Sequence, residues 1–235
     1  MYLPGIFFDP TMLIIIPGII IASIAQMKIN MAYETYSRVA NSKGLVGAEV
    51  AKDLLRIAGI SDVSVEMVRG RLSDHYDPSK KVVRLSQSVY CGNSVASLSV
   101  AAHEVGHAIQ HHYGYIPLTI RSSIAPVVNF SSKASWILIT IGLIFGFMSN
   151  SLILLQIGIV LFTVVVIFQL ITLPVEFNAS KRALEMLEEY SFLQKNEING
   201  SKKVLGAAAL TYVAAALTGI LQLIRLLVIF NNRDD

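Results

Sequence analysis

Long apolar runs alternate with polar segments along this chain, and the runs are the first guide to its fold. A helix needs about 20 apolar residues to cross the hydrocarbon layer of a bilayer. Four runs approach or exceed this length, and we expect each to form a transmembrane helix: Leu3–Ala25, Pro126–Phe147, Leu152–Leu173 and Val204–Phe230. Only the short uncharged link 148–151 separates the second run from the third, which predicts a helical hairpin.

The polar region between the first and second runs predicts a small α+β module. Apolar residues at helical spacing predict a helix over Leu45–Ala58 that ends at Gly59. Alternating apolar and polar residues predict a strand over Val63–Val68, and a second strand is expected over Lys81–Leu85 after a turn at 77–80. We expect these two strands to form a hairpin.

The expected fold is therefore mainly α: a membrane protein with about four transmembrane helices and a small α+β module. Its parts are an N-terminal transmembrane helix (1–26), the module (27–120), a transmembrane helical hairpin (121–173), a helical connection (174–203), and a C-terminal transmembrane helix with its tail (204–235). Lys and Arg concentrate in the segments Lys28–Arg84 and Lys181–Lys203. The positive-inside rule then places both segments in the cytoplasm and both termini outside.

Composition supports a membrane protein and excludes other classes. Hydrophobic residues make up 54% of the chain and charged residues only 15%, against roughly 25% charged residues in an average soluble protein. The net charge of +3 is modest, and no basic stripe with interleaved aromatic residues indicates nucleic-acid binding. The single cysteine, Cys91, excludes an intrachain disulfide, and we interpret it as a small core or surface residue rather than a nucleophile.

The chemistry of the chain centres on the sequence His103-Glu104-Val105-Gly106-His107, in a helix that Asn93 or Ser94 is placed to cap. Histidines four residues apart lie on one face of a helix, so both imidazoles can reach one zinc ion. A bound zinc lowers the pKa of its water from 15.7 to about 7. Glu104, beside the metal, is then the expected general base in the hydrolysis of a peptide bond.

Context favours a metal site over an ordinary amphipathic helix that happens to carry two histidines. Four of the five histidines in the chain fall between His103 and His112. Small residues surround the motif, and its flanks are apolar, as expected of a buried site. A non-catalytic membrane scaffold or metal-binding protein and a metal transporter are the rival functions.

A catalytic zinc usually has a third protein ligand and one open position. His111 lies too far along the same helix to converge on the ion, so we expect His111 and His112 to support the ligands from behind or to lie at the surface. Glu176, on the same predicted side as the histidines, is the better candidate, because carboxylates this close to a membrane boundary usually have a function or a partner. The alternative is a solvated carboxylate that opens a helix over Glu176–Tyr190, and the residues alone favour neither.

Several separated motifs, in order along nearly the whole chain, resemble the YugP-type neutral zinc metallopeptidases of bacterial membranes. The motifs are Gly44–Ala51, Asp74–Pro78, Val82–Ser86, the stretch from Ser94 through the H-E-x-x-H motif to Gln110, and Leu173–Ser180. The arrangement is more distantly similar to membrane gluzincins of the HtpX and CAAX-protease type.

This resemblance implies a gluzincin-like module in which His103, His107 and Glu176 bind one catalytic Zn²⁺ ion. It also implies a bacterial inner (plasma) membrane protein that contacts lipid, faces the cytoplasm with its active site, and cleaves a peptide or protein substrate. The oligomeric state stays open. Relatives of the gluzincin type usually have Asp four residues after the ligand Glu, to orient a ligand histidine. Here that position is Ser180, and either Ser180 or Asn178 is expected to be the orienting partner.

Other polar residues have more than one interpretation. The cluster 74–77 is a candidate second metal site or transition-state donor, although a turn is simpler. The strand Lys81–Leu85 is a candidate edge for pairing with a substrate backbone. Arg182 is a candidate oxyanion stabiliser, with a salt bridge or a solvated charge as the simpler role. Trp136 and Tyr212 are expected to face lipid or to pack.

Overall fold

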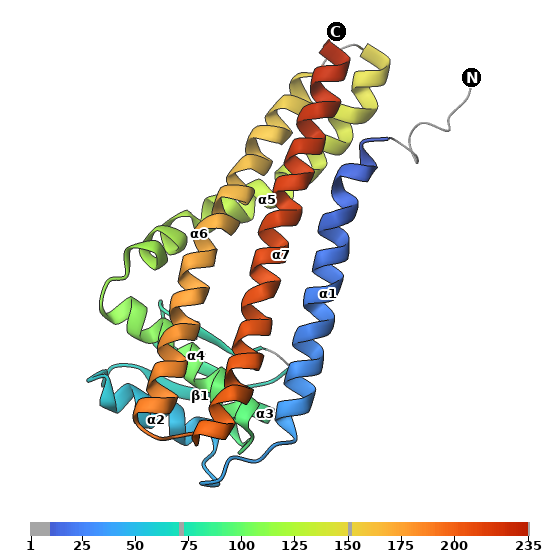
Figure 1. Ribbon diagram of the computed structural model, residues 1–235. Coiled ribbons are helices and arrows are strands. Elements are labelled where there is room, and N and C mark those ends of the chain that lie inside the picture. Colours follow the sequence, from blue (N-terminus) through green and yellow to red (C-terminus); the bar gives the residue numbers. More distant parts are fainter. Residues whose placement is uncertain (1–9, 71–72, 150–151, 235) are drawn as a thin grey trace. The chain divides into compact units, whose positions relative to one another are not determined.

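The computed structural model describes residues 10–70, 73–149 and 152–234, and these residues are mainly helical with one small sheet (Figure 1). Residues 3–9 of the first expected helix and 150–151 of the expected link lie outside the described residues. The helices are α1 (Met12–Ser37), α2 (Gly47–Ile57), α3 (Gln87–Tyr90), α4 (Val95–His112), α5 (Ile116–Ser149), α6 (Ile153–Glu189) and α7 (Lys195–Asp234). The strands are β1 (Ser64–Val68), β2 (His75–Asp77) and β3 (Val82–Ser86).

Four helices in the described part are long and apolar enough to cross a membrane, as the apolar runs predict. They are Met12–Ser37, Ile116–Phe145, Ile153–Glu189 and Lys195–Asn232. The helices extend beyond the predicted runs, because polar residues continue the same backbone hydrogen bonding. In particular, α6 passes through Pro174 without a break, so the third run and the predicted helix over Glu176–Tyr190 are one element.

The chain divides into two compact units. The first comprises Met1–Ile24, Ile120–Thr172 and Tyr212–Asp235, and the second comprises Ala25–Thr119 and Leu173–Thr211.

Close helix packing holds the first unit together. Gly142 of α5 is needed because a Cβ there would lie 2.4 Å from the backbone nitrogen of Leu155 in α6. Small residues at such contacts let membrane helices approach each other. Trp136, about half exposed, packs edge-on against Phe162 with ring centroids 6.1 Å apart, so it both packs and presents apolar surface.

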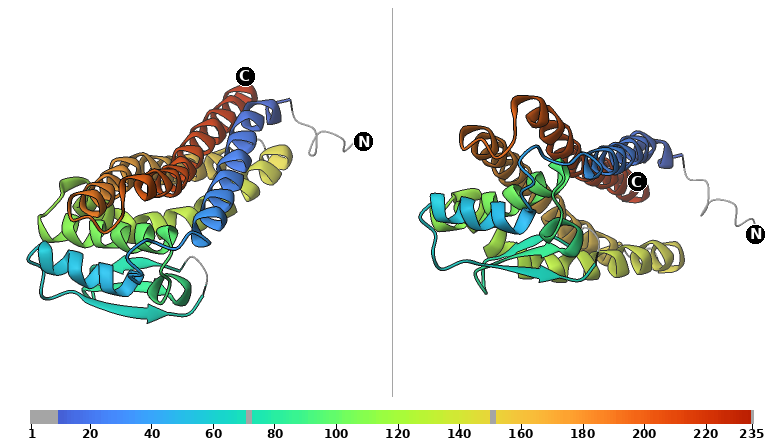
Figure 2. Two further views of the ribbon diagram at one scale, coloured as in Figure 1. Left: turned by 60° about the horizontal axis from the view of Figure 1, so that its bottom comes forward. Right: turned by 90° about the horizontal axis from the view of Figure 1, so that it is seen from below.

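The core of the second unit is built by α2 and α4, which pack over the three-stranded sheet (Figure 2). Leu54 of α2, Leu85 of β3 and Leu98 of α4 are fully buried in one cluster. The stripe predicted over Leu45–Ala58 is thus the buried face of α2. The cap predicted at Asn93 or Ser94 is Ser94, whose hydroxyl accepts a hydrogen bond from the backbone N–H of Ser97.

The sheet differs from the predicted hairpin. Its order is β1-β3-β2, and β1 pairs with β3 in parallel, while β2 pairs with β3 antiparallel. The turn at 77–80 is confirmed, because the Asp77 carboxylate accepts hydrogen bonds from the backbone N–H groups of Ser79 and Lys80. That turn joins β2 to β3. The prediction that Lys81–Leu85 is an edge strand is wrong, since β3 is paired on both sides.

Candidate metal centre

Helix α4 carries both histidines of the motif on one face. His103 and His107 are one turn apart, and their rings meet edge to face with centroids 4.7 Å apart. His107 is 8% exposed, and Ala102, Val105 and Ala108 around it are buried. The two polar rings of the motif therefore stand on a buried, apolar stretch of α4.

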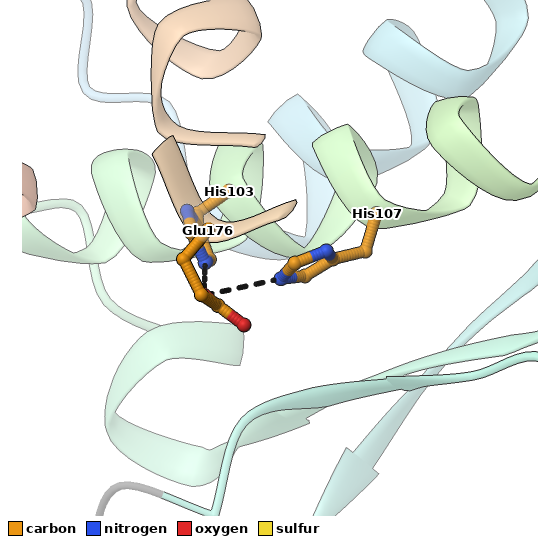
Figure 3. A group of neighbouring side chains, drawn as sticks. All are labelled: His103, His107 and Glu176. Atoms are coloured by element: carbon orange, nitrogen blue, oxygen red, sulfur yellow. Dashed lines mark hydrogen bonds and ion pairs between the residues drawn. The ribbon is translucent and has the colours of Figure 1, made fainter. Parts of the chain in front are cut away.

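Glu176 comes from the part of α6 that belongs to the second unit, and its side chain points at both rings (Figure 3). Its Oε2 atom lies 3.2 Å from His103 Nε2 and 3.6 Å from His107 Nε2. The residue is only 2% exposed. The alternative of a solvated carboxylate that opens a separate helix is therefore wrong.

Gly106 makes this approach of α4 and α6 possible. A Cβ at this position would lie 2.8 Å from the backbone oxygen of Ala179, closer than real Cβ atoms come. The glycine between the two histidines thus lets the backbone of α6 lie against α4, one turn past Glu176.

The spacing of the three donor atoms suits a zinc ion. Zinc binds nitrogen at about 2.0–2.1 Å and oxygen at about 2.0–2.2 Å in tetrahedral geometry, so two ligand atoms of one ion lie about 3.3 Å apart. The two distances from Glu176 Oε2 bracket that value, and the three donors all lie within 4.8 Å of one another. Imidazole and carboxylate are also ordinary zinc ligands.

Glu104 lies next to the cluster on α4 and is 8% exposed. Unlike Glu176, its carboxylate takes part in no hydrogen bond within the part of the chain that the structure describes. It therefore has free acceptor capacity, which a proton acceptor requires, and its negative charge acts on His107.

Ser180, four residues after Glu176, contacts His103 from behind. Its hydroxyl lies 3.1 Å from His103 Nδ1. Of the two predicted orienting partners, Ser180 contacts a histidine directly, whereas Asn178 bonds Gln110 and Arg182. The serine hydroxyl reaches the ring, but unlike the Asp found at this position in gluzincin-type relatives it carries no negative charge.

Sequence reasoning missed Gln110, which lies behind the other histidine. Its side chain is fully buried, and its Oε1 atom lies 3.0 Å from His107 Nδ1. An amide one turn after the second histidine, on the buried side of an apolar helix, was the signal that could have found it.

Other predicted polar residues bond partners other than the three donors. The Tyr76 hydroxyl bonds His111 Nδ1 at 2.8 Å, and His111 and His112 are exposed. His75–Asp77 forms β2 rather than a turn, and Asp74 accepts hydrogen bonds from Ser86.

Arg182 forms no ion pair among the described residues, and its Nε donates a hydrogen bond to Asn178 Oδ1 at 2.9 Å. Cys91 is exposed, in agreement with a surface role.

The charges at the site alter the protonation of His107. Burial of the ring alone lowers its pKa, but the hydrogen bond with Glu176 and the negative charges of Glu104 and Glu176 outweigh burial. The pKa of His107 is therefore raised above its ordinary value of 6.5. When its ring is protonated, His107 forms a buried ion pair with Glu176.

We therefore expect the metal-free protein to be most stable at mildly acidic pH. The pKa of His107 is higher in the folded protein than in the unfolded chain, where it is about 6.5. The resulting stabilisation is therefore complete below about pH 6.5 and is lost as the pH rises through the folded pKa. The melting temperature of chelator-treated protein should fall over this window, and the fall should flatten in Glu176→Gln. A melting temperature that rises through the window would contradict the ion pair. With zinc the slope should reverse, because zinc needs the deprotonated ring.

Comparison with known proteins gives two matches and one negative result. The sequence matches the family described as "Putative neutral zinc metallopeptidase" over residues 11–231. It is 52% identical over 212 residues to a protein of Bacillus subtilis (strain 168) named "Putative membrane protease YugP", covering 90% of this chain and 92% of that protein. No solved structure matches.

Proposed function

The chain belongs to this family of zinc metallopeptidases, and on that premise we propose that it is a membrane-embedded, zinc-dependent endopeptidase. One observation carries the proposal: two imidazoles of α4 and a buried carboxylate of α6 converge at the spacing that one zinc ion needs. Two histidines on one helix and a glutamate on a later helix make a gluzincin-like ligand set.

In this proposal His103, His107 and Glu176 hold one catalytic zinc ion. The ion would supply Lewis acidity, which makes hydroxide available near neutral pH and polarises the scissile carbonyl. Glu104 accepts a proton as general base and returns it to the leaving amine. The buried walls of α4 exclude bulk water, which strengthens the electrostatic interactions inside the site.

The direct test combines metal content with proteolysis. Protein purified in detergent should contain one equivalent of zinc by elemental analysis and should cleave casein, and a chelator should remove both properties. A non-catalytic metal-binding protein would keep zinc and leave casein intact. Protein that binds no metal at all would exclude the proposed centre.

We further propose that the second unit lies in the cytoplasm of a bacterial cell, because it contains most of the Lys and Arg residues. Cys91, exposed and the only cysteine, offers a direct measurement. A membrane-impermeant maleimide should label Cys91 only after permeabilisation. In a Cys91→Ser background, a cysteine appended after Asp235 should be labelled in intact cells. The reverse pattern would overturn the orientation.

A further inference from the structure

Gln110 is bonded at both ends of its side-chain amide. Its Nε2 atom donates to the backbone oxygen of Val175 at 2.8 Å and to Asn178 Oδ1 at 3.0 Å. Its Oε1 atom faces His107 Nδ1 at 3.0 Å. The oxygen and NH₂ ends of such an amide could be exchanged unless its partners determine which end donates.

The partners do fix it. A backbone carbonyl can only accept a hydrogen bond, so the NH₂ group of Gln110 must face Val175. The guanidinium of Arg182 can only donate, so the atom of Asn178 that it contacts is the oxygen. That oxygen also faces the NH₂ group of Gln110. Two independent contacts therefore assign the same orientation of the amide.

The consequence falls on His107. With its NH₂ group turned to α6, Gln110 presents only an oxygen to the ring, and an oxygen acceptor requires a proton on Nδ1. In a neutral imidazole the other nitrogen then carries the lone pair. That nitrogen, Nε2, is the one that lies 3.6 Å from Glu176 Oε2.

We propose that Gln110, oriented by Val175, Asn178 and Arg182, is a positioning residue that sets the tautomer of His107 and keeps its Nε2 lone pair directed at the metal position. This inference rests on the proposed function for its consequence, but its geometry stands without a metal. Arg182 then acts as the far end of this chain of hydrogen bonds rather than as an oxyanion stabiliser.

The two histidines differ in this respect. Ser180 bonds His103 Nδ1 through a hydroxyl, which can donate or accept, so this contact alone does not select a tautomer. The tautomer of His107 is thus fixed by its neighbour, whereas the contact from Ser180 is compatible with either tautomer of His103. Loss of Gln110 should therefore weaken binding more than loss of Ser180.

The test compares Gln110→Met, which keeps the length but removes both polar ends, with Asn178→Asp, which keeps the acceptor for Gln110 and Arg182. Zinc affinity is measured by competition with a chelating indicator. The His107 tautomer is read from imidazole ¹⁵N shifts in zinc-free protein at a pH where the ring is neutral. Gln110→Met should weaken zinc binding by about 10- to 100-fold and lose the Nδ1–H tautomer. Asn178→Asp should keep both within about threefold.

Ser99→Ala is the matched structural control. Ser99 lies one turn before His103 on the same helix, is fully buried, and bonds Val95 and Ser201, neither of which is a proposed ligand. It should lower the melting temperature without changing zinc affinity. Equal losses of affinity in Ser99→Ala and Gln110→Met would overturn the inference, as would an unchanged tautomer in Gln110→Met. A wild-type protein that binds no zinc but shows the Nδ1–H tautomer would refute the proposed function and leave the positioning role intact.

Discussion

Glu104→Gln should bind zinc as the wild type does and should lose peptide hydrolysis, with kcat reduced by roughly 10²- to 10⁴-fold, the usual contribution of a general base. The substitution keeps the size of a side chain that is 8% exposed, so the packing of α4 should survive. Glutamine cannot accept a proton at neutral pH. Casein cleavage in detergent and elemental zinc analysis on the same sample measure the two properties together.

Glu197→Gln is the matched control for loss of a buried carboxylate. Glu197 is 9% exposed and accepts hydrogen bonds from the backbone N–H groups of Ser42 and Gln194, both remote from the histidines in sequence. This variant should be less stable but should keep its activity per folded molecule. Native cleavage rates in zinc-loaded Glu104→Gln would remove Glu104 from the mechanism.

Glu176→Ala should weaken zinc binding by more than about 100-fold, because it removes a ligand rather than a hydrogen bond behind one. A ligand that binds only the folded state stabilises it by about 4 kcal/mol at 1,000 times its dissociation constant. Chelation should therefore lower the melting temperature of the wild type and should leave that of Glu176→Ala nearly unchanged. Thermal unfolding with and without chelator measures the difference.

The control for this substitution lies on the same helix. Glu185 is more than half exposed and pairs with Lys181 on the surface of α6. Glu185→Ala should keep the response to chelator, because exposed ion pairs contribute little to stability. If Glu176→Ala keeps wild-type zinc affinity, another group must supply the third bond and the proposed ligand set is wrong.

Local patterns in the sequence were enough to predict the helices that carry the site. The spacing of His103 and His107 and the apolar stripe of α2 depend only on helical periodicity, so both could be read without a fold. The four helices that are long and apolar enough to cross a membrane follow from apolar runs of the right length. The Ser94 cap follows from a side chain that satisfies a free backbone N–H group.

Pairing between distant segments was less accessible. We expected β1 and β3 to form an antiparallel hairpin. They do pair, but in parallel, and the antiparallel partner of β3 is β2, which lies between them in sequence. The three residues of β2 are too few to show an alternating pattern, so nothing local marked them as a strand. Because β2 was missed, β3 was wrongly predicted to be an edge strand, whereas it lies at the centre of the sheet.

The sequence by itself predicted the two candidate ligands of α4, the proposed general base and a membrane protein, because each prediction depends on residues close together in the chain. Only the tertiary structure showed that Glu176 reaches both imidazoles across 73 residues from His103, and that Gln110 and Ser180 support those rings. The reason is physical: whether a buried carboxylate meets a histidine depends on how closely α4 and α6 pack at Gly106, and that contact has no periodic signature in the sequence.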